Sequence, residues 1–337
     1  MTAPQLAQET IDADEESYFA DLAQRLQNRI SQMYQHGIMR RDAHPKMHGL
    51  VRASFEVEHD LPPELRVGVF QPGKHYQTWV RFSNQNGSIQ DDHERDIRGV
   101  ALKLMQVPGA KLLPEESDAP THDFILISTK VFVTRNAREF DELVQSMMKG
   151  WLPTIGFFLT HLHDTLNLLK SSKVFGNPLH IHYYSTTPYL FGPGRAVKYC
   201  LRPHHPHPDP VPDDAGPDFM REAMAHQLRN HDAKFDFMVQ FQTDAQRMPI
   251  EDPSEEWDEK ESPFIKLATL RIAQQQFDTP EQRVYGDNLS FSPWHALPEH
   301  RPLGSVNRAR RVVYDAISRF RHLKNGVVRK EPSHFEI

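Results

Sequence analysis

The sequence predicts an α+β fold in which an antiparallel β-barrel is surrounded by helices. Short runs rich in β-branched and aromatic residues recur between residues 50 and 272. Turn sequences such as QPGK (71–74) and NQNGS (84–88) separate them. These runs do not alternate regularly with helical patterns, so a parallel βαβ architecture is not expected.

Length and composition limit the classes of protein that are compatible with this chain. A chain of 337 residues can bury one large core, and we expect a single domain over residues 1–337. The net charge of −6 argues against nucleic-acid binding by bulk electrostatics. The single cysteine, Cys200, excludes an internal disulfide framework and a cysteine-rich metal site.

The N-terminal part, residues 1–40, is expected to be a helical segment that precedes a core over residues 41–337. Its first residues are acidic and no basic region is followed by an apolar run, so we expect no signal peptide and a cytoplasmic protein. Residues 15–34 have apolar side chains at helical spacing, and Asp12 or Asp14 would cap this helix. The expected strands then cover residues 50–57, 66–71, 76–82, 98–104, 123–128, 179–187, 196–202, 234–242 and 263–272.

Residues 136–170 are expected to be helical and contain the most apolar window of the chain, WLPTIGFFLTHLHDTLNLL (151–169). This window includes Pro153, two histidines and Asp164. We therefore interpret it as a core or channel-lining helix and expect no stable membrane insertion.

The last long helix, NRARRVVYDAISRFR (307–321), has an unusual distribution of charge. Arg310, Tyr314, Ile317 and Arg321 fall on one stripe at 100° per residue. An amphipathic helix normally has apolar residues on such a stripe. Because a buried arginine is costly without an anionic partner, the stripe predicts that this helix faces an anion or an anionic ligand.

Several other polar residues have both a functional and an ordinary explanation. His44 and His48 could be loop histidines, Arg81 could pair with a carboxylate, and Tyr314 could be a core tyrosine with a bonded hydroxyl. The pair His180 and His182 shares one strand face, but no third metal ligand is evident. The HHPH run (204–207) lies in a proline-rich connection, which is a poor scaffold for a metal.

Taken together, the motifs resemble the haem-binding core of the catalase superfamily, in matching order along nearly the whole chain. The family's R-x-x-H-A-K-G segment is similar to residues 41–47, followed by Phe55-Glu56-Val57 with one extra residue between them. Its V-R-F-S strand matches residues 80–83 and its R-D-x-R-G-x-A-x-K loop matches residues 95–103. LSFSPWHALPEHRPLG (289–304) is similar to the stretch before the proximal helix, whose R-x-x-x-Y motif matches Arg310 and Tyr314.

The resemblance implies haem b as cofactor, with Tyr314 as the axial ligand of the iron and Arg310 favouring its phenolate form. Cofactor contacts are implied for Arg41, Arg81 and Arg321, which would meet the haem propionates, and more loosely for Phe140. The implied catalytic residues are His44, which would transfer a proton between the peroxide oxygens, Ser83, which would orient it, and Ser128 in place of the family's distal asparagine. Since one residue is inserted before Phe55, His48 remains the rival to His44.

The expected function is haem-dependent hydroperoxide metabolism, either as a peroxidase or in lipid-hydroperoxide conversion, with weak catalase activity. The chain ends soon after the proximal helix, as in the short catalase-related branch that includes allene oxide synthases. Those synthases have threonine before the distal histidine, whereas this chain has Ala43. Genuine disproportionation of hydrogen peroxide is one alternative, and a non-catalytic haem-binding or peroxide-sensing protein is another. The expected partner is a peroxide or an organic hydroperoxide, and the sequence is compatible with a homo-oligomer.

Overall fold

The computed structural model describes residues 5–205, 209–211 and 213–336, with the exception of the side chain of Asp164. The HHPH run therefore lies partly outside the described residues. His180 forms an ion pair with Asp209 at 3.2 Å.

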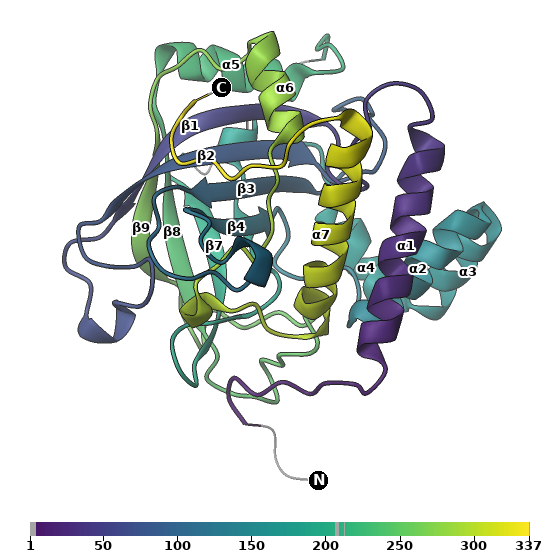
Figure 1. The fold of residues 1–337 in the computed structure, drawn as a ribbon, viewed down its shortest axis with the longest axis horizontal. Coiled ribbons are helices and arrows are strands. Elements are labelled where there is room, and N and C mark those ends of the chain that lie inside the picture. Colours follow the sequence, from purple (N-terminus) through teal and green to yellow (C-terminus); the bar gives the residue numbers. More distant parts are fainter. Residues whose placement is uncertain (1–4, 206–208, 212, 337) are drawn as a thin grey trace.

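Eight strands close into an antiparallel β-barrel, which confirms the expected fold class (Figure 1). The strand order is β5-β4-β3-β2-β1-β9-β8-β7, and pairing of β5 with β7 closes the ring. The short strand β6 pairs with the outer part of β7. The strands are β1 (Met47–Val57), β2 (His75–Asn84), β3 (Arg98–Leu104), β4 (His122–Ile127), β5 (Tyr183–Tyr184), β6 (Tyr189–Leu190), β7 (Ala196–Pro203), β8 (Ala233–Phe241) and β9 (Ile265–Ile272).

The helices lie outside the barrel in two groups. Helices α1 and α7 run side by side, and α2 and α3 lie beyond them, whereas α5 and α6 lie near β1 (Figure 1). The helices are α1 (Glu15–Met33), α2 (Ala137–Lys149), α3 (Trp151–Thr160), α4 (Leu162–Ser171), α5 (Phe219–Asn230), α6 (Pro280–Asn288) and α7 (Ser305–Asn325).

The interior of the barrel is filled by aromatic side chains. Phe55, Phe124 and Phe237 contact one another with ring centroids 4.7–6.2 Å apart, and burial of such rings is a major source of stability. A separate apolar cluster joins α1, α2 and α7 outside the barrel and includes Leu26 and Ile317. Because the interior is packed, the barrel itself leaves no room for a large ligand.

Several expectations about local structure are wrong. The expected strand over residues 179–187 is limited to Tyr183–Tyr184, because a 3₁₀ turn occupies Pro178–His180. Residues 66–71 form no strand, because the 3₁₀ turn at Pro63–Leu65 is followed by a second turn in which Gly68 has a φ of 50°. The apolar side chains of this loop are still buried, and the carbonyl of Val69 accepts a hydrogen bond from the hydroxyl of Tyr76. At α1, Asp14 occupies the N-cap position, but its carboxylate pairs with Arg138 and caps nothing.

The apolar window 151–169 also differs from its expected role as a core or channel-lining helix. It is divided between α3 and α4, and most of its large side chains face outward. The division occurs at His161, which ends α3 in a non-helical conformation. Among the described residues, no helix has both the length and the apolar character that crossing a membrane requires.

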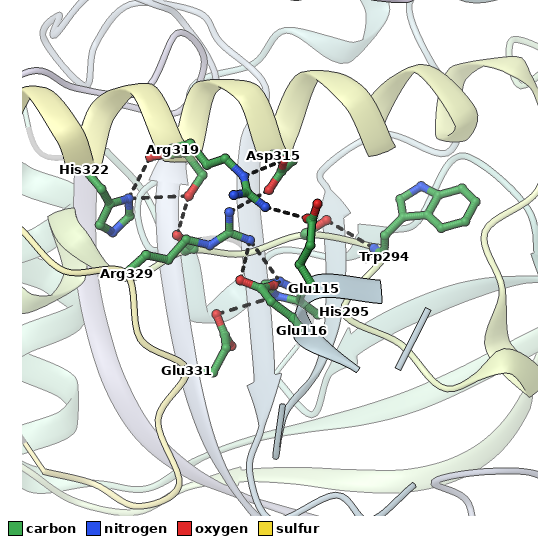
Figure 2. A network of polar contacts seen from close by, with 12 residues as sticks. Glu115, Glu116, Trp294, His295, Asp315, Arg319, His322, Arg329 and Glu331 are labelled. Atoms are coloured by element: carbon green, nitrogen blue, oxygen red, sulfur yellow. Dashed lines mark hydrogen bonds and ion pairs between the residues drawn. The ribbon is translucent and has the colours of Figure 1, made fainter. Parts of the chain in front are cut away.

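The segment that follows α7 returns across the barrel and is held by a polar network between α7 and the barrel strands (Figure 2). Arg329 pairs with Asp315 of α7 at 2.6 Å and with Glu116 at 2.8 Å. Glu331 pairs with the buried Lys103 of β3 at 2.5 Å. The network therefore links α7, the C-terminal segment and the barrel.

Candidate active site

A large cavity lies between the outer face of β2–β4 and the helices α1, α2 and α7. Its empty volume is about 1480 Å³, including the part that is open to solvent. The sequence-predicted residues that line it are Arg41, His44, Arg81, Ser83, Phe140, Arg310, Tyr314 and Arg321. Residues from both ends and the middle of the chain therefore meet at one place.

The barrel wall of the cavity follows from the two-residue period of the strands. Val80 and Phe82 of β2 point into the barrel core, so Arg81 and Ser83 point to the outer face. Ser83 is paired with Gly99 of β3 across the ladder. The V-R-F-S and R-G motifs thus lie next to each other, with polar groups on the side that faces α7.

His44 lies directly before β1 and is held in an unusual conformation. Its φ of 61° is in the left-handed region, which is uncommon for residues other than glycine and is often found at functional sites. The backbone is fixed on both sides, since its N–H donates to the carbonyl of Gln85 and its own carbonyl accepts from Arg81. Nδ1 of its ring lies 3.0 Å from Oγ of Ser83.

The ring of His44 is uncharged at neutral pH. Burial is the largest cause, and together with the nearby cations Arg81, Arg310 and Arg41 it lowers the pKa of His44 to about 3. Since Ser83 engages Nδ1, Nε2 is the nitrogen that remains for proton exchange.

Gly99 makes room for this ring. A Cβ atom at residue 99 would lie 2.5 Å from Cε1 of His44 and 3.2 Å from Oγ of Ser83. The first distance is shorter than any normal contact, so a side chain at this position would displace the imidazole.

The rival histidine, His48, lies outside the cavity. The β1–β2 register shifts between Met47 and Gly49, so His48 is the extra residue of a β-bulge. Its side chain is buried, and its Nε2 lies 2.6 Å from Oδ1 of Asn84. The inserted residue before Phe55 is therefore absorbed by the bulge, and His44 is the histidine that faces the cavity.

On the opposite wall, α7 presents Tyr314 and Arg310. The guanidinium of Arg310 donates to the Tyr314 hydroxyl at 2.9 Å and to Oδ1 of Asn307 at 3.2 Å. Burial opposes the charge on Arg310, but its interaction with the Tyr314 phenol raises the pKa of Arg310. The Arg310 guanidinium therefore lies one helical turn from Tyr314 and contacts its oxygen directly.

Three further arginines surround the cavity without a carboxylate partner. Within the part of the chain that the structure describes, Arg41, Arg81 and Arg321 form no ion pair, and their hydrogen bonds go to backbone carbonyls such as those of His44 and Asp287. The Nε atoms of Arg81 and Arg321 are buried and have no hydrogen-bond partner. Unsatisfied buried donors of this kind are rare in proteins.

The electrostatics of these arginines show only partial compensation: the Asp287 carboxylate favours their charge, but within the described part of the chain its ion pair is with Arg40. Burial lowers the pKa of Arg41 to about 10 and holds the pKa values of Arg81 and Arg321 well below the usual value for arginine. Repulsion from Arg41 lowers the pKa values of the other two further. A carboxylate placed among them would relieve both the desolvation and the repulsion.

The structure brings together all predicted residues except one. Phe140 of α2 lines the cavity and packs against Phe132 with ring centroids 5.7 Å apart. Ser128 is not part of the lining, and its Oγ accepts a hydrogen bond from the backbone N–H of Arg98 at 2.9 Å. The geometry therefore gives no support to Ser128 as a second donor to a bound peroxide.

Sequence reasoning missed Gly99 and Gln85 as site residues. Gln85 lines the cavity two residues after Ser83, and its buried Oε1 has no hydrogen-bond partner. Its position directly after the V-R-F-S-N stretch was the available signal. For Gly99, the signal was its place inside the R-D-x-R-G-x-A-x-K motif.

Comparison with known proteins relates this arrangement to one family. The family model described as catalase matches residues 6–152. The chain is 28% identical over 260 residues to a catalase-related peroxidase of Mycolicibacterium paratuberculosis (strain ATCC BAA-968 / K-10), a match that covers 72% of this chain and 77% of that protein.

Solved catalase structures share the fold. A fungal catalase is similar with a TM-score of 0.69 at 16% identity, and catalase A from Saccharomyces cerevisiae with a TM-score of 0.68 at 18% identity. Each match covers 95% of this chain, but only 65% and 68% of those two chains. This protein thus spans about two thirds of the length of these catalases.

The match of residues 6–152 to the catalase family model, the related peroxidase and the shared barrel fold make this chain similar to the catalase superfamily. This similarity implies a haem cofactor, and the cavity residues fit one. The unpartnered guanidinium groups suit the propionate carboxylates of a haem, and the Arg310–Tyr314 pair suits a phenolate ligand to iron.

Proposed function

We propose that this protein is a haem b-dependent oxidoreductase that acts on hydroperoxides, as a peroxidase or in lipid-hydroperoxide conversion. The observation that carries the proposal is that two different polar groups line opposite walls of one cavity. An arginine-bonded tyrosine lies on α7, and a neutral histidine fixed by a serine lies on the barrel.

Each group has a defined part in the proposal. Tyr314 would bind the iron, Arg310 would favour its phenolate form, and Arg41, Arg81 and Arg321 would hold the propionates. The bound haem supplies the redox chemistry of peroxide cleavage. Nε2 of His44 would accept a proton from one peroxide oxygen and return it to the other, while Ser83 keeps the ring in place.

The low pKa of His44 is consistent with this role once the charge of the cavity is considered. The four largest causes of this low pKa are burial and the cations Arg81, Arg310 and Arg41. Carboxylates bound to the arginines would offset part of that positive charge and raise the pKa of His44 towards the working pH, where a general base is most effective.

One experiment distinguishes the proposed function from its two alternatives, a genuine catalase and a non-catalytic haem-binding or sensing protein. The purified protein is compared for oxygen release from hydrogen peroxide and for consumption of a fatty-acid hydroperoxide. Predominant consumption of the organic hydroperoxide supports the proposal, and oxygen release as the main activity would make the protein a genuine catalase. A haem spectrum without either activity would make it a haem-binding or sensing protein, for which the His44–Ser83 contact would have no use.

The axial ligand is tested separately. The Tyr314→Phe variant is expected to lose haem or the spectrum of a ferric phenolate while the chain still folds, because the phenolate oxygen is the proposed ligand. The matched control is Tyr285→Phe, since Tyr285 packs on Trp79 away from the cavity. An unchanged haem content and spectrum in Tyr314→Phe would refute the assignment.

A further inference from the structure

The α3–α4 hairpin carries a continuous set of large apolar side chains on the surface. Trp151 is 71% exposed, Leu159 is 69% exposed and Leu162 is 64% exposed. The other exposed large apolar residues of this region are Met147, Met148, Leu152, Ile155, Leu166 and Leu169. Contiguous apolar surface of this kind usually marks an interaction site.

The exposed residues follow from the helical spacing. On α3, Trp151, Leu152, Ile155 and Leu159 fall within one stripe, while Phe157 on the other side is buried. On α4, Leu162, Leu166 and Leu169 form a second exposed stripe. Each helix has ten residues and is therefore about 15 Å long.

Positive charges are placed at the ends of the hairpin rather than on its apolar face. Lys149 comes directly before it, and Lys170 and Lys173 come at its end. The exposed Arg95 donates to the carbonyls of Leu169 and Ser172 at the same end. None of the ion pairs among the described residues involves these four cations, and Asp164 is the only acidic residue in the sequence from 145 to 173.

We infer that the α3–α4 hairpin docks this protein on the surface of an anionic phospholipid bilayer. Apolar side chains would enter the boundary between headgroups and acyl chains, and the lysines would reach the anionic headgroups. Trp151 is the residue type that is enriched at that boundary. In Figure 1, α3 lies at the outer edge of the molecule, beyond α1 and α2, where a flat surface can approach it.

The test is cosedimentation of the full-length protein with vesicles. One set contains phosphatidylcholine alone, and the other contains equal amounts of phosphatidylcholine and phosphatidylglycerol. Wild type is expected to bind the anionic vesicles at least about tenfold more strongly than Trp151→Gln/Leu159→Gln/Leu166→Gln. Glutamine keeps the helix propensity of these exposed positions, and circular dichroism checks that the variant is folded.

Two control variants test whether binding is specific to the apolar face of the hairpin and whether it depends on the nearby lysines. Ile11→Gln/Leu323→Gln/Val328→Gln removes three apolar side chains that are 66–86% exposed elsewhere and should bind like wild type. Lys149→Glu/Lys170→Glu should lose the preference for anionic vesicles.

Three outcomes would overturn the inference. Wild type could fail to bind anionic vesicles, or the hairpin variant could bind them as well as wild type does. Wild type could also be a dimer that the hairpin substitutions convert to a monomer, without any vesicle binding. In that case the apolar face would be an interface between two copies of this chain.

Discussion

At the scale of single residues, His44 depends on a neighbour that has no side chain. Its ring occupies the space where a Cβ at residue 99 would be, and its backbone is held by Gln85 and Arg81. The strained φ of His44 persists because these contacts determine it together. The orientation of the imidazole therefore depends on the paired strands β2 and β3 as well as on His44 itself.

Gly99→Ala tests this dependence. The added methyl group should push the ring out of line with Ser83 and lower peroxide turnover about a hundredfold, as expected for a misplacement of about 1 Å. Haem content should not change, because Tyr314 and the arginines are untouched. Steady-state turnover and the haem spectrum are measured together, and Gly156→Ala is the control since its Cβ would contact nothing within 4 Å. Full turnover in Gly99→Ala would show that the observed orientation is not needed.

Alanine substitutions of His44 and His48 should have opposite effects on peroxide turnover and on stability. His44→Ala should lower peroxide turnover by about 10²–10⁴-fold and retain haem, because it removes proton transfer and no ligand. His48→Ala should retain turnover but lower the free energy of unfolding by about 1–3 kcal/mol, because it removes a buried ring and its contact with Asn84 Oδ1, which then keeps only the hydrogen bond from Arg98. Turnover and urea unfolding of both variants decide the matter, and an inactive His48→Ala with an active His44→Ala would reverse the roles.

Sequence patterns located most of the residues of this site but not their contacts. Motif spacing brought His44, Ser83, Arg81 and Tyr314 into consideration. The choice between His44 and His48 required the register of β1, because a β-bulge has no reliable signature in one sequence. The contact of Ser128 could not be foreseen for a related reason, since only the spatial pairing of β3 and β4 shows that its hydroxyl accepts a hydrogen bond from the backbone of Arg98.

At the scale of elements, α7 has two polar faces with different purposes. Its inner face carries Tyr314 and Arg310, and its outer face carries Asp315 and Arg319, which belong to the network of Figure 2. The network centres on the buried His295, which contacts Glu116 and lies 3.0 Å from Asp123. These ion pairs tie α7 to the barrel through residues that do not line the cavity.

The raised pKa of His295 predicts that the folded protein loses stability at alkaline pH. Burial opposes its charge, but Glu331, Asp123 and Glu116 raise the pKa of His295 from 6.5 to about 9. The folded protein thus holds this proton more tightly than the unfolded chain does. The stabilisation is complete below about pH 6.5 and is lost as the pH rises through about 9, on the order of 3 kcal/mol in all.

Urea unfolding between these pH values measures this loss. The His295→Gln variant is the control, since its free energy of unfolding should lack this part of the pH dependence. A wild-type stability that stays constant over the range, or that falls equally in the variant, would contradict the prediction.

Element types were easier to predict than the exposure of their faces. The helical period of residues 15–34 and 307–321 identified α1 and α7. The 66–71 run and the 151–169 window were misjudged for one reason. Apolar composition indicates that a segment seeks an apolar environment, but it does not show whether a strand, a buried loop or an outside surface provides it.

At the scale of the whole molecule, the cavity concentrates positive charge that the folded chain does not neutralise. Arg41, Arg81 and Arg321 form no ion pairs in the described part of the chain. Folding without a bound anion therefore includes an unfavourable term, whereas folding with a dicarboxylate ligand does not. The stability of the protein should depend strongly on whether the cofactor is bound.

Arg81→Met should accordingly have effects of opposite sign. The haem-free protein should gain about 1–2 kcal/mol in its free energy of unfolding, because a buried charge is replaced by an apolar side chain. Haem affinity should fall at least about tenfold, because one propionate contact is lost. Urea unfolding and haemin titration measure the two effects, and Arg283→Met on the exposed surface of α6 should change neither. A haem-free Arg81→Met that is less stable than wild type would contradict the charge argument.

The division of the cavity between two walls has a consequence for the rate of cofactor uptake. A rigid, flat macrocycle in this cavity would contact both α7 and the barrel, and the C-terminal segment joins these two walls through Arg329 and Glu331. We therefore expect release of the C-terminal segment to limit the rates at which haem enters and leaves. The affinity of the folded protein for haem should not depend on this step. Exchange of haem should accelerate in alkali, where His295 loses its proton, long before the site itself is altered.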